Sequence, residues 1–113
     1  MSRADAANVA EPCFRLRGPV TLDNLVAIRS EGEAALAAAG SATSIDVSGL
    51  VGGNSAALAL LMAWFREANA QGKELVFTAI PAELEKIIEL SGMSAVLPIA
   101  EHSGASGREE SEA

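Results

Sequence analysis

The sequence predicts a single α/β domain, with a mainly parallel or mixed sheet and helices packed against it. Strand-like and helix-like segments alternate along the chain, which implies right-handed crossovers between neighbouring strands. Of the 113 residues, 50% are hydrophobic and only 4% are aromatic. We therefore expect one core built mainly from aliphatic side chains.

The predicted elements follow from hydrophobic periodicity and from turn residues. The strands are expected at residues 13–20, 44–48, 74–80 and 95–99. The helices are expected at residues 22–39, 54–71 and 82–90. In the first helix Leu22 belongs to the inward-facing set, with Thr21 as N-cap and Gly40 as the stop, and Gly92 caps the third helix.

Composition divides the chain into three parts. Residues 1–12 are predicted to be a flexible N-terminus, residues 13–100 the folded domain, and residues 101–113 a disordered acidic tail. The single cysteine, Cys13, cannot form an internal disulfide and is expected to act as a small buried hydrophobe.

The charge balance excludes several classes of partner. The formal net charge is −7 and no basic run occurs, which argues against nucleic acid and against direct adsorption to anionic lipid. The longest apolar run, residues 56–65, is about half of the roughly 20 residues that a membrane-spanning helix needs. Without a signal-like N-terminus the protein is expected to be cytoplasmic, with no direct membrane insertion.

The glycine-rich turn at residues 49–53 invites a test for a nucleotide site. A P-loop needs a lysine directly after its last glycine, but here Asn54 and Ser55 follow. A helix start with glycines can still attract an anion weakly, so a small nucleotide or lipid binder stays open. Nucleophilic catalysis by Ser55 would need a base, and the only histidine, His102, lies in the tail. No catalytic residue, metal site or cofactor is predicted.

The helix after this turn carries the strongest functional signal. Ser55, Ala59, Met62 and Arg66 line up on one flank, and alanines continue that surface. An Ala/Met-lined surface with few charges favours docking of another protein, although alanine bias alone also gives such helices. The predicted partner-binding residues are Leu50, Gly52, Gly53, Asn54, Ser55, Ala59, Met62, Ala63 and Arg66.

Asn54 and Ser55 have a second interpretation. Either side chain can serve as a helix N-cap, which contributes about 1 kcal/mol. Alternatively, Ser55 is a phosphoacceptor, because a helix N-terminus tolerates the charge of a phosphate. Both interpretations stay open on the sequence.

The segment "SIDVSGLVGGNSAALALLMAWFREANAQGKELVFTAIPAELEKIIELSGMSAVLP" resembles a STAS domain, most closely the STAS subunit of a phospholipid ABC transporter (MlaB-like). The resemblance runs from about Cys13 to Ile99. It implies a sheet of four to five strands with helices packed on it. The family's Asp-Ser/Thr-x-Gly motif falls on residues 54–57, where Asn54 replaces the acid and Ala57 the glycine.

The resemblance implies a non-catalytic cytoplasmic subunit, peripheral to the inner membrane through its partner. That partner would be the ATPase of a lipid-transporting ABC complex, which also holds a permease and lipid-binding subunits and maintains outer-membrane lipid asymmetry. The alternative within the same family is an anti-sigma-factor antagonist regulated by phosphorylation of Ser55. The absence of the acidic neighbour at Asn54 counts against this alternative.

Overall fold

A computed structural model describes residues 11–100 of the chain. Its elements, in chain order, are β1 (Phe14–Gly18), α2 (Leu25–Ala38), β2 (Ala42–Leu50), α3 (Ser55–Ala70), β3 (Glu74–Thr78), α4 (Ala82–Leu90) and the 3₁₀ turn η1 (Met93–Ala95). The predictions made for residues 1–10 and 101–113 lie outside the described residues.

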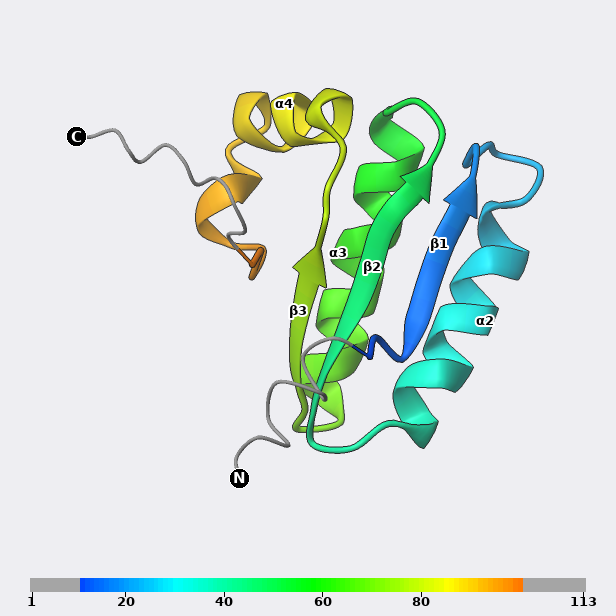
Figure 1. The fold of residues 1–113 in the computed structure, drawn as a ribbon, viewed down its shortest axis with the longest axis vertical. Coiled ribbons are helices and arrows are strands. Elements are labelled where there is room, and N and C mark those ends of the chain that lie inside the picture. Colours follow the sequence, from blue (N-terminus) through cyan, green and yellow to red (C-terminus); the bar gives the residue numbers. More distant parts are fainter. Residues whose placement is uncertain (1–10, 101–113) are drawn as a thin grey trace.

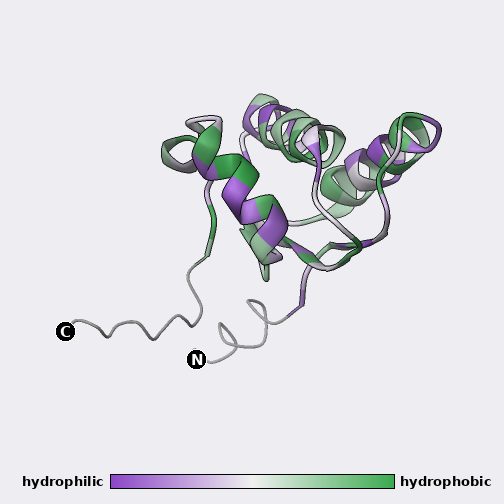
Figure 2. Cartoon of the chain, turned by 90° about the horizontal axis from the view of Figure 1, so that it is seen from above, coloured by the Kyte–Doolittle hydropathy of each residue, from purple (hydrophilic) through white to green (hydrophobic). Residues whose placement is uncertain are grey.

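The three strands form a parallel sheet in the order β1-β2-β3 (Figure 1). Because the order does not reverse, two right-handed crossovers place their helices on the same face of the sheet. Figure 2 shows α2 and α3 on that common side, each with hydrophilic and hydrophobic residues around its circumference. The predicted α/β class and parallel sheet are confirmed.

The predicted fourth strand at 95–99 is wrong for most of its length. Met93–Ala95 is a 3₁₀ turn, and only Ile99 forms a bridge, parallel to Phe77. Pro98 has no N–H to donate to a ladder, and its carbonyl instead accepts the N–H of Phe77 at 2.9 Å. The described sheet therefore has three strands, fewer than the expected four to five.

The first helix also begins later than predicted. The backbone N–H of Thr21 donates to the side-chain oxygen of Asn24 at 2.8 Å, and the backbone N–H of Asn24 donates to the hydroxyl of Thr21 at 3.3 Å. These bonds form a turn, and α2 starts only at Leu25. Leu22 therefore stands in the turn before the helix and is 86% exposed, contrary to the expected inward position.

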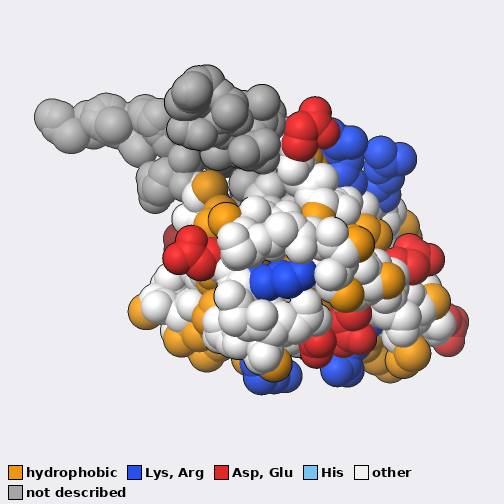
Figure 3. All heavy atoms as spheres, turned by 90° about the horizontal axis from the view of Figure 1, so that it is seen from below, with side chains coloured by type: hydrophobic (Ala, Val, Ile, Leu, Met, Phe, Trp, Pro, Cys, Tyr) orange, Lys and Arg blue, Asp and Glu red, His pale blue; other side chains and the backbone are white. Residues whose placement is uncertain are grey.

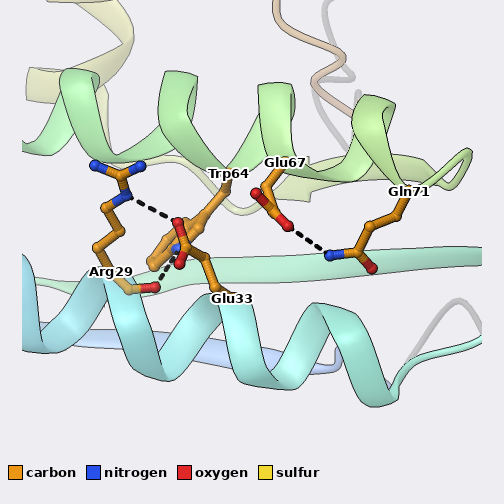
Figure 4. Close-up of polar contacts among 5 residues, drawn as sticks. All are labelled: Arg29, Glu33, Trp64, Glu67 and Gln71. Atoms are coloured by element: carbon orange, nitrogen blue, oxygen red, sulfur yellow. Dashed lines mark hydrogen bonds and ion pairs between the residues drawn. The ribbon is translucent and has the colours of Figure 1, made fainter.

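The core lies between the sheet and the helices, and its centre is Trp64 of α3. The indole is fully buried, packs directly on Gly32 of α2, and donates Nε1–H to the carbonyl of Arg29 at 3.1 Å (Figure 4). Its ring meets Phe14 edge-on, with centroids 5.4 Å apart. The other large, fully buried side chains are Phe77, Leu16, Leu36, Ile45, Leu60, Leu61, Leu84, Ile88, Val20 and Val47.

The candidate interaction surface

Asn54 is the N-cap of α3. Its backbone is extended, and its side-chain oxygen accepts the N–H of Ala57 at 2.9 Å. The amide nitrogen of the same side chain donates to the carbonyl of Val20 at 3.1 Å, which ties the start of α3 to the β1–α2 loop. Of the two capping candidates, the structure therefore selects Asn54. Ser55 is the first helical residue, and it is exposed.

The Asn54 geometry also explains one departure from the family motif. A carboxylate could cap the helix equally well, but it has no N–H to donate to Val20. The asparagine makes both bonds with one side chain.

The predicted flank of α3 reaches the surface along most of its length. Ser55, Ala59 and Arg66 are exposed, whereas Met62 is half-buried and packs partly against the core. We call these four residues the α3 stripe. No acidic residue occupies the first turn of the helix. That the stripe binds a partner stays a prediction.

Two of the predicted partner-binding residues are buried. Ala63 is only 8% exposed and Leu50 only 7%. The expectation that these two side chains face a partner is therefore wrong.

Val51 lies within the Leu50–Gly53 loop that was expected to contact a partner, and its side chain, unlike that of Leu50, is at the surface. It is 63% exposed, directly after the end of β2. Strand alternation was the available signal, because a residue that follows an inward-pointing leucine points outward.

The glycines of the turn have structural reasons. Gly52 has a φ of +75°, a left-handed conformation that favours glycine. A Cβ on Gly53 would lie 2.7 Å from the backbone nitrogen of Leu84, so the loop packs tightly against the start of α4. A shallow groove lies between Gly52–Asn54 and α4, where Glu83, Lys86 and Leu90 also line it. The glycine-rich pattern is thus explained without a bound phosphate.

Asp46 of β2 has a structural role where β2 pairs with β1. The pairing of β1 with β2 is irregular between Arg15 and Arg17, and there the N–H of Ser48 donates to the Asp46 carboxylate at 2.8 Å. Partial burial tends to raise the pKa of Asp46. The Ser48 hydrogen bonds and the nearby Arg15, 3.6 Å away, lower it, and the net shift of the pKa is downward.

Other chemistry receives little support within residues 11–100. This part of the chain holds no group of three or more His, Cys, Asp or Glu side chains that could bind a metal ion. Cys13 is half-buried at the start of β1, so it is less enclosed than predicted. On the end of the molecule drawn in Figure 3, described Lys and Arg side chains are interspersed with Asp and Glu, without a basic patch. Within the same residues, no helix has the length and apolar character needed to cross a membrane.

A family model described as "Mlab, STAS domain" matches residues 4–98. The chain belongs to the STAS domain family. No curated protein matches it.

Solved structures agree with a STAS fold. The anti-sigma factor antagonist SpoIIAA in its unphosphorylated form is 20% identical, with a TM-score of 0.59 over 84% of each chain. An anti-sigma factor antagonist from Mycobacterium paratuberculosis is 19% identical, with a TM-score of 0.66 over 80% of this chain and 76% of the other. At such identities the likeness shows the fold, so the function of this STAS domain has to be argued from its surface.

Proposed function

We propose that this STAS domain is a non-catalytic subunit that binds the ATPase of an inner-membrane phospholipid ABC transporter. The complex would also contain a permease and lipid-binding subunits, and it would maintain the lipid asymmetry of the outer membrane. The domain would be cytoplasmic and would reach the membrane only through the ATPase.

The α3 stripe is the observation that carries this proposal. Ser55, Ala59 and Arg66 are exposed, and Met62 lies between them with part of its side chain accessible. Small side chains let a partner helix or loop approach the backbone of α3 closely, and methionine adapts to irregular partner surfaces. The match to a model described as "Mlab, STAS domain" supports the choice of an ABC transporter as the partner complex.

A negative charge introduced at the centre of the α3 stripe tests the proposal. We expect Ala59→Glu to weaken binding to the ATPase of the same organism's phospholipid transporter at least tenfold, because a carboxylate buried without a partner costs several kcal/mol. The affinity would be measured by biolayer interferometry with purified proteins.

Ala34→Glu is the matched control, since Ala34 is also an exposed helical alanine but lies in α2. Its affinity should equal that of the wild type. Equal affinity for Ala59→Glu and wild type would remove the stripe from the interface, and no binding by the wild type would refute the function.

Regulation through Ser55 is the second candidate function. The Ser55 side chain is exposed at the start of α3, where the helix dipole tolerates the roughly −1.5 to −2 charge of a phosphate. In this case the domain would be an anti-sigma-factor antagonist. Mass spectrometry of protein isolated from cells would then detect a phosphoserine peptide that is lost in Ser55→Ala. Its absence under all growth conditions would favour the transporter subunit.

A further inference from the structure

A groove of about 360 Å³ lies on the face of the sheet opposite α2 and α3. Strand alternation places it there, because Ile45, Leu75 and Phe77 point into the core and the residues between them point to the other face. The volume lies near the lower end for ligand pockets, which span roughly 300–1,000 Å³. The groove is lined by residues of β2, β3 and the segment after η1, among them Ala42, Ser44, Glu74, Val76, Thr78 and Ala100.

Ser44 brings a buried hydroxyl to this groove. The residue is only 7% exposed, and its Oγ has no hydrogen-bond partner among the described residues. The other hydroxyl that faces the groove from β3 is different, since Thr78 Oγ1 donates to the carbonyl of Ile45 at 3.4 Å. Buried polar atoms nearly always have a hydrogen-bond partner, so an orphaned one indicates a bound water, ion or ligand. Ser44 therefore marks a place where the groove can receive a polar group.

Glu74 provides the charge of the groove. It is the one ionisable side chain among the described residues that line it. The parallel register pairs Ala42 with Glu74 and Ser44 with Val76, so Ser44 lies diagonally across from Glu74, within reach of a long side chain. Neither of the ion pairs found among residues 11–100 involves Glu74. A carboxylate and a hydroxyl are both acceptors, and one ammonium group has three N–H donors to offer them.

The part of the groove beyond these two acceptors is apolar. Val76 and Thr78 continue along β3, and Ala100 borders them. The N–H of Ala100 donates to the carbonyl of Phe77 at 2.9 Å, which holds this border beside β3. Residues 74–78 span roughly 13 Å at about 3.3 Å per residue. An ammonium group near Glu74 thus leaves room for a short apolar chain along the strand.

We propose that this groove binds a small primary alkylammonium ligand. The ammonium group donates hydrogen bonds to the Glu74 carboxylate and to the Ser44 hydroxyl, and the alkyl chain lies over Val76 and Ala100. An alkyl carboxylate is disfavoured at the same place, because its charge is repelled by Glu74. The site is separate from the α3 stripe and does not rest on the proposed function.

Nuclear magnetic resonance titration of the full-length protein with n-hexylamine at neutral pH tests this inference. We expect shifts of the Ser44, Val76 and Ala100 amide signals, with a dissociation constant on the order of 1 mM. 1-Hexanol and hexanoate are the matched ligands, since they keep the alkyl chain and replace the ammonium group. Both should bind at least threefold more weakly than hexylamine.

Two substitutions test the two acceptors. Ser44→Ala should weaken hexylamine binding about threefold and leave the urea stability unchanged or higher, because the lost hydroxyl has no partner in the fold. Glu74→Gln should weaken it about threefold to fivefold, because Glu74 is exposed and its charge is screened. Glu85→Gln is the matched control, since Glu85 is an exposed glutamate of α4 outside the groove, and it should retain the affinity.

Three results would overturn the inference. Equal binding of hexylamine and hexanol would mean that the groove adsorbs alkyl chains without recognising the ammonium group. Equal weakening by Glu74→Gln and Glu85→Gln would assign the effect to the net charge of the chain. The absence of shifts in the three groove amides would leave water as the partner of Ser44.

Discussion

Gly32 of α2 determines how closely the two central helices approach. Trp64 of α3 occupies the place where a side chain at position 32 would stand, and its indole nitrogen reaches the Arg29 carbonyl only at that separation. A glycine in the middle of a helix is unfavourable by about 1 kcal/mol relative to alanine. Its presence here follows from the packing of the tryptophan.

Gly32→Ala should therefore destabilise the domain by about 1–3 kcal/mol despite the better helix propensity of alanine, because the new Cβ overlaps the indole ring. Urea unfolding monitored by tryptophan fluorescence would measure the change. Gly40→Ala is the matched control, since a Cβ there meets no atom within 4 Å, and it should change stability by less than about 0.5 kcal/mol. A Gly32→Ala variant as stable as the wild type would show that the indole relaxes freely.

Asp46 makes stability depend on pH. Its folded-state pKa lies below the ordinary value of 3.8, so the charged carboxylate stabilises the fold above that pH. This contribution is lost as the pH falls through the folded-state pKa.

Asp46→Asn should lower the free energy of unfolding at pH 7 by less than about 1 kcal/mol, because Arg15 is half-exposed and the ion pair is screened. At pH 2.5 the stability difference between variant and wild type should become smaller. Urea titrations at the two pH values would measure it. A difference that grows toward low pH would contradict the assigned direction of the pKa shift.

At the scale of elements, the start of α3 depends on one side chain with two bonds. Asn54 caps the helix and also holds the β1–α2 loop through Val20. The sequence left the cap open between Asn54 and Ser55, and the fold shows it at Asn54. The bond to Val20 joins residues 34 apart and also became visible only in the fold.

Asn54→Asp should keep the cap and lose the bond to Val20, so we expect a loss of stability of up to about 1 kcal/mol, partly offset by the helix dipole. Asn54→Ala loses both bonds and should cost about 1–2 kcal/mol. Hydrogen exchange of the Val51 amide, which bonds Gly18, would report loosening of the loops in both variants. Unchanged stability and unchanged exchange in Asn54→Asp would show that the Val20 bond contributes nothing.

Of the two glycines near α4, Gly52 is explained by the local sequence and Gly53 by the tertiary structure. The pattern Gly52-Gly53 predicts a turn, and the positive φ of Gly52 agrees. The tight contact between Gly53 and Leu84 depends on where α4 is placed, which no local pattern contains.

At the scale of the whole molecule, the sheet order explains where the surfaces lie. Parallel strands in the order β1-β2-β3 direct their C-terminal ends to one end of the domain. The β1–α2 and β2–α3 loops therefore lie next to each other there (Figure 1), and α3 begins at the same end with Ser55. The position of Ser55 beside both loops depends on this topology.

The sequence by itself determined the alternation of strands and helices, the family, and the exposed α3 flank at Ser55, Ala59 and Arg66. These properties follow from local periodicity and from the order of short motifs. Only the tertiary structure decided that Ala63 and Leu50 are buried, that Leu22 is exposed, and that residues 95–99 add one bridge instead of a strand. The burial of Ala63 and Leu50 and the bridge at Ile99 depend on contacts between segments distant in the chain, and hydrophobic spacing within a single segment carries no information about such contacts. The exposure of Leu22 follows instead from the hydrogen-bonded turn between Thr21 and Asn24, which hydrophobic spacing does not reveal either.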